Sequence, residues 1–153
     1  MKKIILFLIS SVLCISTLQA QQNLRIKQFN LEKGLAIQGY DPMAYFIQKK
    51  ALLGNKNIAA TVEGVTYYFS SQKNKDLFLI NPKQFEPQYG GWCAYAMGAV
   101  NEKVEIDPET FKVINGKLYL FYHSWTNNTL TKWNADESNL KSKADKNWML
   151  IYK

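Results

Sequence analysis

The residues best suited to chemistry in this chain are Cys93, the single histidine His123 and the thioether of Met97. A thiolate, an imidazole and a thioether together suit copper, because soft sulfur donors favour Cu(I). A structural zinc site needs four nitrogen or sulfur ligands, more than one cysteine and one histidine supply. If Cys93 binds a metal ion, we therefore expect copper or another soft metal.

Two other interpretations of Cys93 stay open. A buried free cysteine packs as a small hydrophobic residue, and the Gly90-Gly91 turn beside Trp92 is compatible with packing alone. A redox or nucleophilic thiol must ionise, which a helix beginning after the glycine turn would favour. The sequence shows no Cys-x-x-Cys pair and no paired carboxylates. Binding is therefore a better prediction than catalysis.

Aromatic residues gather around two turn motifs in the sequence. Such rings can line a pocket for a small apolar ligand, or they can fill the core of a domain without disulfides. Asp41 precedes a proline and is predicted to be a turn or capping residue. The predicted turn and pocket residues are Tyr40, Asp41, Tyr89, Gly90, Gly91 and Trp92.

The first twenty residues predict export. Lys2 and Lys3 precede an apolar run over residues 4–18, and Ala20 is a small residue suited to cleavage. The run is too short for a membrane anchor, which needs roughly 20 apolar residues. The bulky residue before Cys14 argues against a lipoprotein. We expect a periplasmic or extracellular protein that is not inserted in a membrane after cleavage.

Cleavage after Ala20 leaves 153 − 20 = 133 residues, enough for one domain with a core of its own. It also removes Cys14, so no intramolecular disulfide can form. The formal net charge falls from +7 to +5 with the loss of two lysines. The remaining lysines are scattered and lack interleaved aromatic residues, so nucleic acid is not an expected partner. A metal ion or a small ligand is the expected partner, and the oligomeric state is left open.

Two β-hairpins are predicted from local patterns. Residues 61–69 alternate between apolar and polar side chains about the turn Glu63-Gly64. Residues 111–122 form the second predicted hairpin about Asn115-Gly116, a dipeptide that readily adopts the positive φ angles of a two-residue turn. We expect the two hairpins to form one small antiparallel sheet.

Helices are predicted between and after the hairpins. Ser70 or Ser71 can cap a helix that ends at Asn81-Pro82. Residues 125–139 place a few apolar residues on one side, and residues 144–148 add a further turn of helix. The fold class is therefore α+β, with helices packed on one face of the sheet. No internal repeat is apparent along the chain.

Several of these motifs together resemble the YHS domain family. The shared features, in chain order, are Asp41-Pro42, Tyr68-Phe69, Ser71, Phe78, Asn81-Pro82 and Phe85. A longer frame, with residues 39–46 and 89–94, is similar to exported single-domain bacterial members of that family. The chain thus divides into the predicted signal peptide (1–20), an N-terminal lead-in (21–35) and, on this resemblance, a YHS-type domain (36–153).

The resemblance implies metal binding only weakly. Many family members carry two cysteines, but these positions hold Ala44 and Asn74 in this chain. The residue before the family's serine, often His or Cys, is Ser70. The family's ligands are therefore not present, and a metal site would have to use Cys93.

Overall fold

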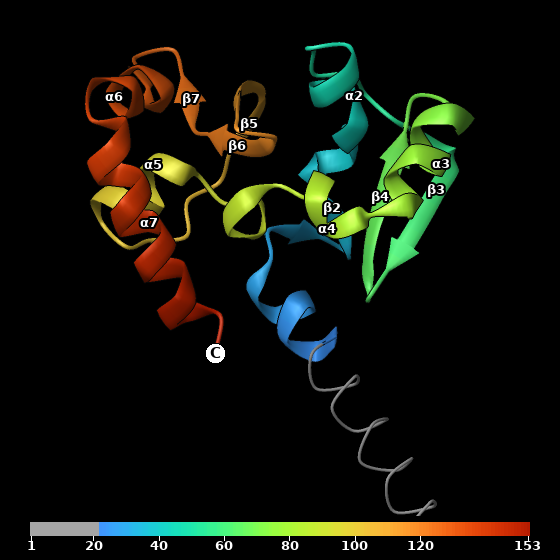
Figure 1. Cartoon of the computed structure of the whole chain (residues 1–153), viewed down its shortest axis with the longest axis horizontal. Coiled ribbons are helices and arrows are strands. Elements are labelled where there is room, and N and C mark those ends of the chain that lie inside the picture. Colours follow the sequence, from blue (N-terminus) through green and yellow to red (C-terminus); the bar gives the residue numbers. More distant parts are fainter. Residues whose placement is uncertain (1–21) are drawn as a thin grey trace, which may run out of the picture.

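The computed structural model describes residues 22–153 (Figure 1). The predicted signal peptide lies outside these residues. Residues 22–28 are helical, and the short strands β1 (Leu31–Glu32) and β2 (Leu35–Ala36) follow them. This is the segment that the sequence analysis assigns to an N-terminal lead-in. Its helical part packs on the rest of the chain, because Arg25 is buried and pairs with Glu86, 61 residues further along the chain.

The first half of the fold is a helix, a hairpin and a second helix. Asp41 caps the first helix, and Ser71 caps the second with a bond from the Asn74 N–H, as predicted. The hairpin turns at Glu63-Gly64, where both residues have positive φ. The elements are η1 (Ile37–Gly39), α2 (Pro42–Ile47), β3 (Asn55–Val62), β4 (Val65–Phe69), α3 (Gln72–Ile80) and α4 (Pro82–Phe85).

The second half contains the other predicted hairpin, which turns at Asn115-Gly116. The helices after it differ from the prediction, because a break at Asp136 separates a short helix from one continuous helix of 15 residues. The elements are η2 (Gln88–Gly91), α5 (Ala94–Ala99), β5 (Asp107–Ile114), β6 (Lys117–Phe121), β7 (His123–Ser124), β8 (Asn127–Asn128), α6 (Thr129–Ala135) and α7 (Glu137–Ile151).

The two halves repeat one backbone plan with an offset of 52 residues. Strands β3 and β4 begin and end 52 residues before β5 and β6, respectively. Both hairpins have a register shift at the same place, after Asn55↔Phe69 in the first and Asp107↔Phe121 in the second. We call residues 35–86 the first unit and residues 87–151 the second unit.

The turns and loops before the hairpins repeat as well. In η1 and η2, three consecutive residues have positive φ, namely residues 37–39 and 89–91. The Asp41 N–H donates to Leu52 O at 2.8 Å, and the Cys93 N–H donates to Val104 O at 3.0 Å. The parallel pairing of Leu35 with Thr66 recurs as the parallel bridge of Pro87 with Leu118.

This internal repeat corrects the sequence-based expectation that there is none. At the offset of 52 residues, few residues are identical, and each is either a glycine with positive φ or a buried residue. Glycines end the left-handed turns and the hairpin turns, where φ is positive. The other identical residues include buried hairpin rings. The identical pairs are Gly39/Gly91, Ala44/Ala96, Gly64/Gly116, Tyr67/Tyr119 and Phe69/Phe121.

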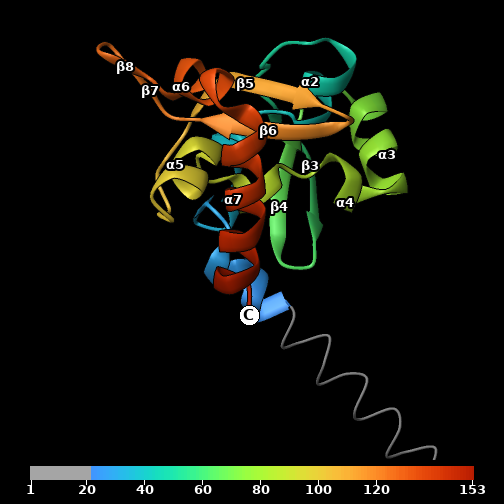
Figure 2. The ribbon, with the colours of Figure 1, turned by 60° about the vertical axis from the view of Figure 1, so that its left-hand side comes forward.

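The hairpins do not join in the single antiparallel sheet that the sequence predicts. One sheet has the order β1-β2-β4-β3, and β5 with β6 forms another. The second edge of β4 is taken by β2 in parallel, and Pro87 occupies the matching position beside β6. In Figure 2 the β5–β6 hairpin runs across the direction of β3 and β4. The fold is therefore mixed α and β with small sheets of two to four strands.

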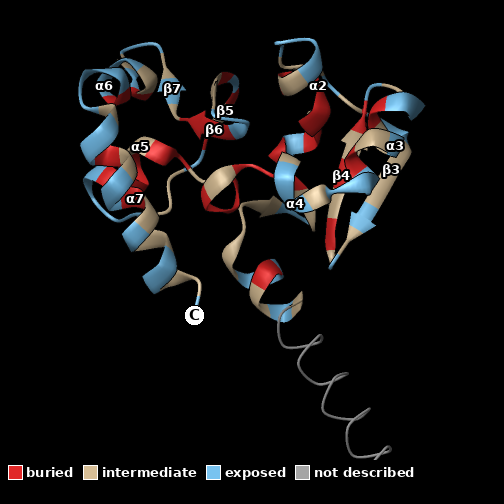
Figure 3. Ribbon diagram, viewed as in Figure 1, coloured by how far each residue is buried: buried red, intermediate tan, exposed pale blue. Residues whose placement is uncertain are grey.

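Buried residues run along β4 and β6 and between the two units (Figure 3). Aromatic rings from the first hairpin and α3 meet in one cluster, where Tyr67 and Phe69 pack on Phe78. A second cluster surrounds Trp133 and joins β6 to α5 and α7. Within residues 22–153, no helix is long and apolar enough to span a membrane.

Candidate functional site

Cys93 occupies the N-cap position of α5 and is fully buried. Its Sγ accepts the backbone N–H of Tyr122 at 3.3 Å and lies 3.5 Å from Thr129 Oγ1. The Thr129 hydroxyl donates its proton to Tyr122 O at 2.7 Å, so the thiol proton makes the contact between Cys93 and Thr129. The sulfur thus ties the end of the second hairpin to the start of α6.

Asp41 holds the equivalent position in the first unit and likewise joins the end of the hairpin to the next helix. Its buried carboxylate caps α2 by accepting the Met43 N–H at 2.8 Å, which confirms the predicted capping role. It also accepts the N–H of Ser70 at 2.8 Å, the counterpart of the Tyr122 bond to Cys93. The Asn74 amide on α3 donates to it at 2.7 Å. We call these two positions, Asp41 and Cys93, the staples of the two units.

The positions at which the resemblance would place metal ligands lie close to the first staple. The Ser70 hydroxyl donates to Asp41 Oδ2 at 2.6 Å, beside the bond from Asn74. The Ala44 N–H donates to Asp41 O at 3.2 Å. A hydrogen-bonded cluster around a carboxylate therefore stands where the resemblance would place thiol ligands.

The other two predicted metal ligands have different surroundings from Cys93. Met97 is fully buried in the Trp133 cluster. The His123 side chain is 44% exposed, and its Nδ1 lies 3.3 Å from Asp107 Oδ2. In the part of the chain that the structure describes, no three His, Cys, Asp or Glu side chains gather in a group that could hold a metal ion.

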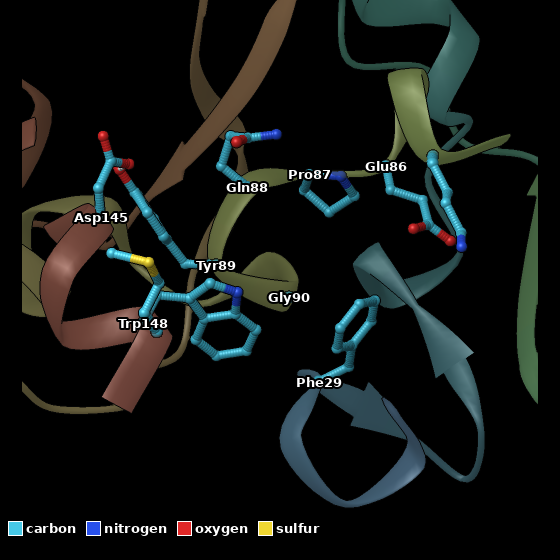
Figure 4. Close-up of a pocket in the computed structure, with 10 residues that line it drawn as sticks. Phe29, Glu86, Pro87, Gln88, Tyr89, Gly90, Asp145 and Trp148 are labelled. Carbon is cyan, nitrogen blue, oxygen red and sulfur yellow. Dashed lines mark hydrogen bonds between the residues drawn. The ribbon is translucent and has the colours of Figure 1, made fainter. Parts of the chain in front are cut away.

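A pocket of about 300 Å³ lies between the N-terminal segment, η2 and the end of α7 (Figure 4). Two of the predicted pocket residues, Tyr89 and Gly90, line it. We call it the η2 pocket. Its lining residues are Phe29, Lys83, Glu86, Pro87, Gln88, Tyr89, Gly90, Asp145, Trp148 and Met149.

The remaining predicted pocket residues take structural contacts elsewhere. The Tyr40 hydroxyl donates to Glu109 Oε1 at 3.3 Å. The Trp92 indole donates to Gln28 O at 2.7 Å, and Lys103 Nζ lies 5.8 Å from its ring centroid. Gly91 belongs to the left-handed turn and its carbonyl accepts the Asn30 amide at 3.3 Å.

Gly90 sets the width of the η2 pocket. Its φ is +61°, and a Cβ there would lie 2.8 Å from Phe29 Cδ1 and 2.9 Å from Trp148 Cη2. The two aromatic walls therefore approach the bare backbone of this turn, which only glycine permits without displacement. The Gly90 carbonyl accepts the Asn30 N–H at 2.9 Å and fixes the turn against the N-terminal segment.

A buried ion pair lies behind one wall of the pocket. Arg25 donates to both carboxylate oxygens of Glu86, and the Tyr67 hydroxyl donates to Glu86 Oε1 at 2.8 Å. The guanidinium also stacks 4.6 Å from the Phe29 ring centroid. Burial would lower the pKa of Arg25, but the hydrogen bonds and charge of Glu86 outweigh it and raise that pKa.

One atom of this pair is imperfectly satisfied. Arg25 Nε lies 3.3 Å from Glu63 Oε2, but the two are not aligned, so Nε has no hydrogen-bond partner among residues 22–153. The contact is an ion pair only, and Glu63 is shared with Lys83 at 3.5 Å. The wall is therefore held mainly by Arg25 and Glu86.

Polar groups stand at the other side of the pocket. The Tyr89 hydroxyl donates to Asp145 Oδ1 at 2.9 Å, and Lys141 Nζ donates to Asp145 Oδ2 at 2.6 Å. Burial, followed by the charge of Asp145, raises the pKa of Tyr89 well above its ordinary value. The pocket thus combines aromatic walls with hydrogen-bonding groups, and its acids are already paired.

The first unit has a smaller counterpart at its own left-handed turn. A pocket of about 260 Å³ is bounded by η1 residues Ile37 and Gln38 together with residues 30–32, 105 and 106. The Gln38 amide donates to Ile106 O at 3.0 Å. This counterpart has no aromatic ring in its lining, whereas the η2 pocket has three.

Comparisons of the chain with family models, characterised proteins and solved structures found no match. The resemblance to the YHS family therefore stays a prediction.

Sequence reasoning missed the repeat and the pocket walls Phe29 and Trp148. A signal for the repeat was present in the spacing Gly-x-x-Tyr-x-Phe, which occurs at residues 64–69 and again at 116–121. Both walls lie outside the motifs, on segments whose proximity depends on the tertiary fold. No local pattern could have found them.

Proposed function

We propose that this protein is an exported binding module without catalytic activity, and that its ligand site is the η2 pocket. The observation that carries the proposal is the pair of aromatic walls, Phe29 and Trp148, converging on Gly90. The volume of about 300 Å³ is at the lower end of the range for small-ligand sites.

The lining suggests a ligand with a flat apolar face and a hydrogen-bonding edge. Trp148 and Pro87 offer apolar surface, whereas Gln88 and Asp145 offer polar groups. Arg25 neutralises Glu86, Lys141 neutralises Asp145, and the exposed Lys83 lies 3.5 Å from Glu63. No strong net charge therefore selects the ligand.

In this proposal Cys93 is structural. Support comes from its equivalence to Asp41, since both side chains join the end of a hairpin to the start of the next helix. A copper site through Cys93, His123 and Met97 stays a prediction from the sequence.

The three described methionines allow a direct test. Met149 lines the pocket, whereas Met43 and Met97 are buried and serve as internal controls. We would label the methionine methyl groups with ¹³C and titrate the mature protein with indole, a flat ring with one donor. We expect a saturable shift of the Met149 signal alone, lost in Trp148→Ala and kept in Ile80→Ala, which changes an exposed residue outside the pocket. No saturable shift at millimolar indole, or one that survives in Trp148→Ala, contradicts the proposal.

A further inference from the structure

The second unit contains an insertion that the first unit lacks. In the first unit Ser70, the end of the hairpin, is followed directly by Ser71, the N-cap of α3. In the second unit, residues 123–127 separate Tyr122 from Asn128, the N-cap of α6. These five residues, with Asn128, build the β7–β8 hairpin. We call residues 123–128 the inserted hairpin.

The inserted hairpin is not required by the backbone plan. The first unit makes the same hairpin-to-helix connection without it, including the bond from the N–H at the end of the hairpin to the staple. Figure 2 shows the insertion as a narrow loop projecting from the body of the molecule. The inserted hairpin is therefore an addition to a complete unit, and we expect its function to be something other than stabilising the fold.

Trp125 is at the tip of the inserted hairpin and is fully exposed to solvent. The other three tryptophans are half-buried or buried. Within residues 22–153, the Trp125 side chain makes no ring contact and no hydrogen bond, although tryptophan has a large apolar surface that is normally buried. A large rigid ring held out on a loop, with few rotatable bonds, is typical of a binding anchor.

The residues around Trp125 are polar but uncharged. Residues 121–131 contain no Lys, Arg, Asp or Glu, in a chain where one residue in five is charged. Ser124, Thr126 and Asn128 have short side chains that can donate or accept hydrogen bonds. The Oδ1 atom of Asn127 is buried and lacks a hydrogen-bond partner among the described residues.

We propose that the inserted hairpin binds an uncharged glycan. The ring of Trp125 offers a flat face for the apolar side of a sugar ring, and the neutral hydroxyl and amide groups match sugar hydroxyls. At the base of the hairpin Asp107 lies 3.3 Å from His123. Its carboxylate already accepts the Glu109 N–H and the Thr110 hydroxyl, so the sugar contacts are assigned to the tip alone. A site for an anionic membrane surface or for nucleic acid would contain lysines. The chain has many lysines elsewhere but none at this tip.

The test follows the indole N–H signals of the mature protein in ¹⁵N NMR spectra. Uncharged tetrasaccharides, namely chitotetraose, cellotetraose and maltotetraose, are added in turn, and phosphatidylglycerol vesicles are added separately. We expect at least one tetrasaccharide to shift the Trp125 signal saturably and to leave the buried Trp133 unmoved. Calorimetry should then show binding weakened about tenfold or more by Trp125→Ala and unaffected by Trp148→Ala in the η2 pocket.

Two outcomes overturn the proposal. One is an unmoved Trp125 signal with all three tetrasaccharides. The other is a response of Trp125 to the vesicles alone, which would assign the tip to a lipid surface. Because the readout is confined to Trp125, either outcome is independent of whether the η2 pocket binds its own ligand.

Discussion

The two units of this protein share one backbone plan over the left-handed turn, the first helix and the hairpin, but they differ in three features that bear on function. The staple is a carboxylate in the first unit and a thiol in the second, at Asp41 and Cys93. The pocket at the left-handed turn has aromatic walls only in the second unit. The second unit alone carries the inserted hairpin with Trp125. The shared backbone plan does not depend on these three features, so the features are the best indicators of function.

The staples show why a lone cysteine need not be a reactive group. Asp41 accepts bonds from two backbone N–H groups and from the side chains of Ser70 and Asn74. Cys93 accepts one backbone N–H and contacts one hydroxyl. Both side chains join a hairpin to the next helix, and we expect the thiol to contribute less to the free energy of unfolding than the carboxylate. The Asp41→Ala and Cys93→Ala predictions measure that difference.

The largest effect is expected from Asp41→Ala. The substitution leaves the N–H groups of Met43 and Ser70 without their acceptor, reduces the Asn74 amide to its longer bond with Ser70 Oγ, and removes the cap of α2. We expect a loss of about 4 kcal/mol in the free energy of unfolding, measured with urea. Asp76→Ala, an exposed carboxylate on α3, is the control and should change stability by less than about 0.5 kcal/mol. A loss below about 1 kcal/mol for Asp41→Ala would show that Asp41 is not the stronger of the two staples.

Gly90→Ala should have the next largest effect, about 2–3 kcal/mol. The new Cβ meets Phe29 and Trp148 in addition to the strain of a positive φ. Gly116→Ala separates the two causes, because its φ is also positive but no atom lies within 4 Å of the added Cβ. Denaturant unfolding should give the smaller loss for Gly116→Ala, about 1 kcal/mol. Equal losses would show that the aromatic walls do not close on Gly90.

Cys93→Ala should cost about 1–2 kcal/mol, less than the change at Asp41. Alanine keeps the apolar character of the site but removes the sulfur that contacts Tyr122 and Thr129. The same urea experiment gives the value. A loss as large as that of Asp41→Ala would mean that the thiol is not the weaker staple.

Deleting residues 123–127 should cost less than about 1 kcal/mol. The deletion joins Tyr122 to Asn128 in the way that Ser70 is joined to Ser71, and the ion pair that it removes, His123 with Asp107, is partly exposed to solvent. Circular dichroism during heating provides the measurement. Failure of the deleted protein to fold would show that the hairpin belongs to the fold.

The smallest effect concerns the equivalent tyrosines Tyr67 and Tyr119. Burial raises the pKa of both, and the charge of Glu86 raises that of Tyr67 further, whereas Lys141 lowers that of Tyr119. Both folded pKa values lie above the unfolded value of about 10, so the neutral form stabilises the fold below that pH and this stability is lost as pH rises. Tyr67→Phe should reduce the alkaline loss of stability more than Tyr119→Phe, measured by urea unfolding between pH 9 and 11. The reverse order would contradict the assigned charges.

The sequence predicts the local parts of this fold and not the distant ones. Asn115-Gly116, Asp41 and Ser71 act through neighbours within a few residues, so their turns and caps follow from residue type. The pairing of Arg25 with Glu86 and the approach of Phe29 to Trp148 depend on chain segments brought together only by folding. The same limit explains the candidate site. Tyr89 and Gly90 were predicted from a turn motif, but the walls that make them a pocket were not.

The repeat escaped prediction for a different reason. Equivalent positions keep the conformation but not the side chain, as Gln38 and Gly90 show in the two left-handed turns. Identity is retained only at glycines with a positive φ and at a few buried residues, so the sequence signal of the repeat is confined to a small number of positions.

Whether Cys93 is a staple or a metal ligand is tested by an anaerobic titration of the mature protein with Cu(I) against a competing chelator. Cys93→Ser and His123→Ala are measured in parallel. We expect the wild type to retain no more Cu(I) than either variant. Tight one-to-one binding that is lost in either variant would contradict this expectation and establish a metal site at Cys93.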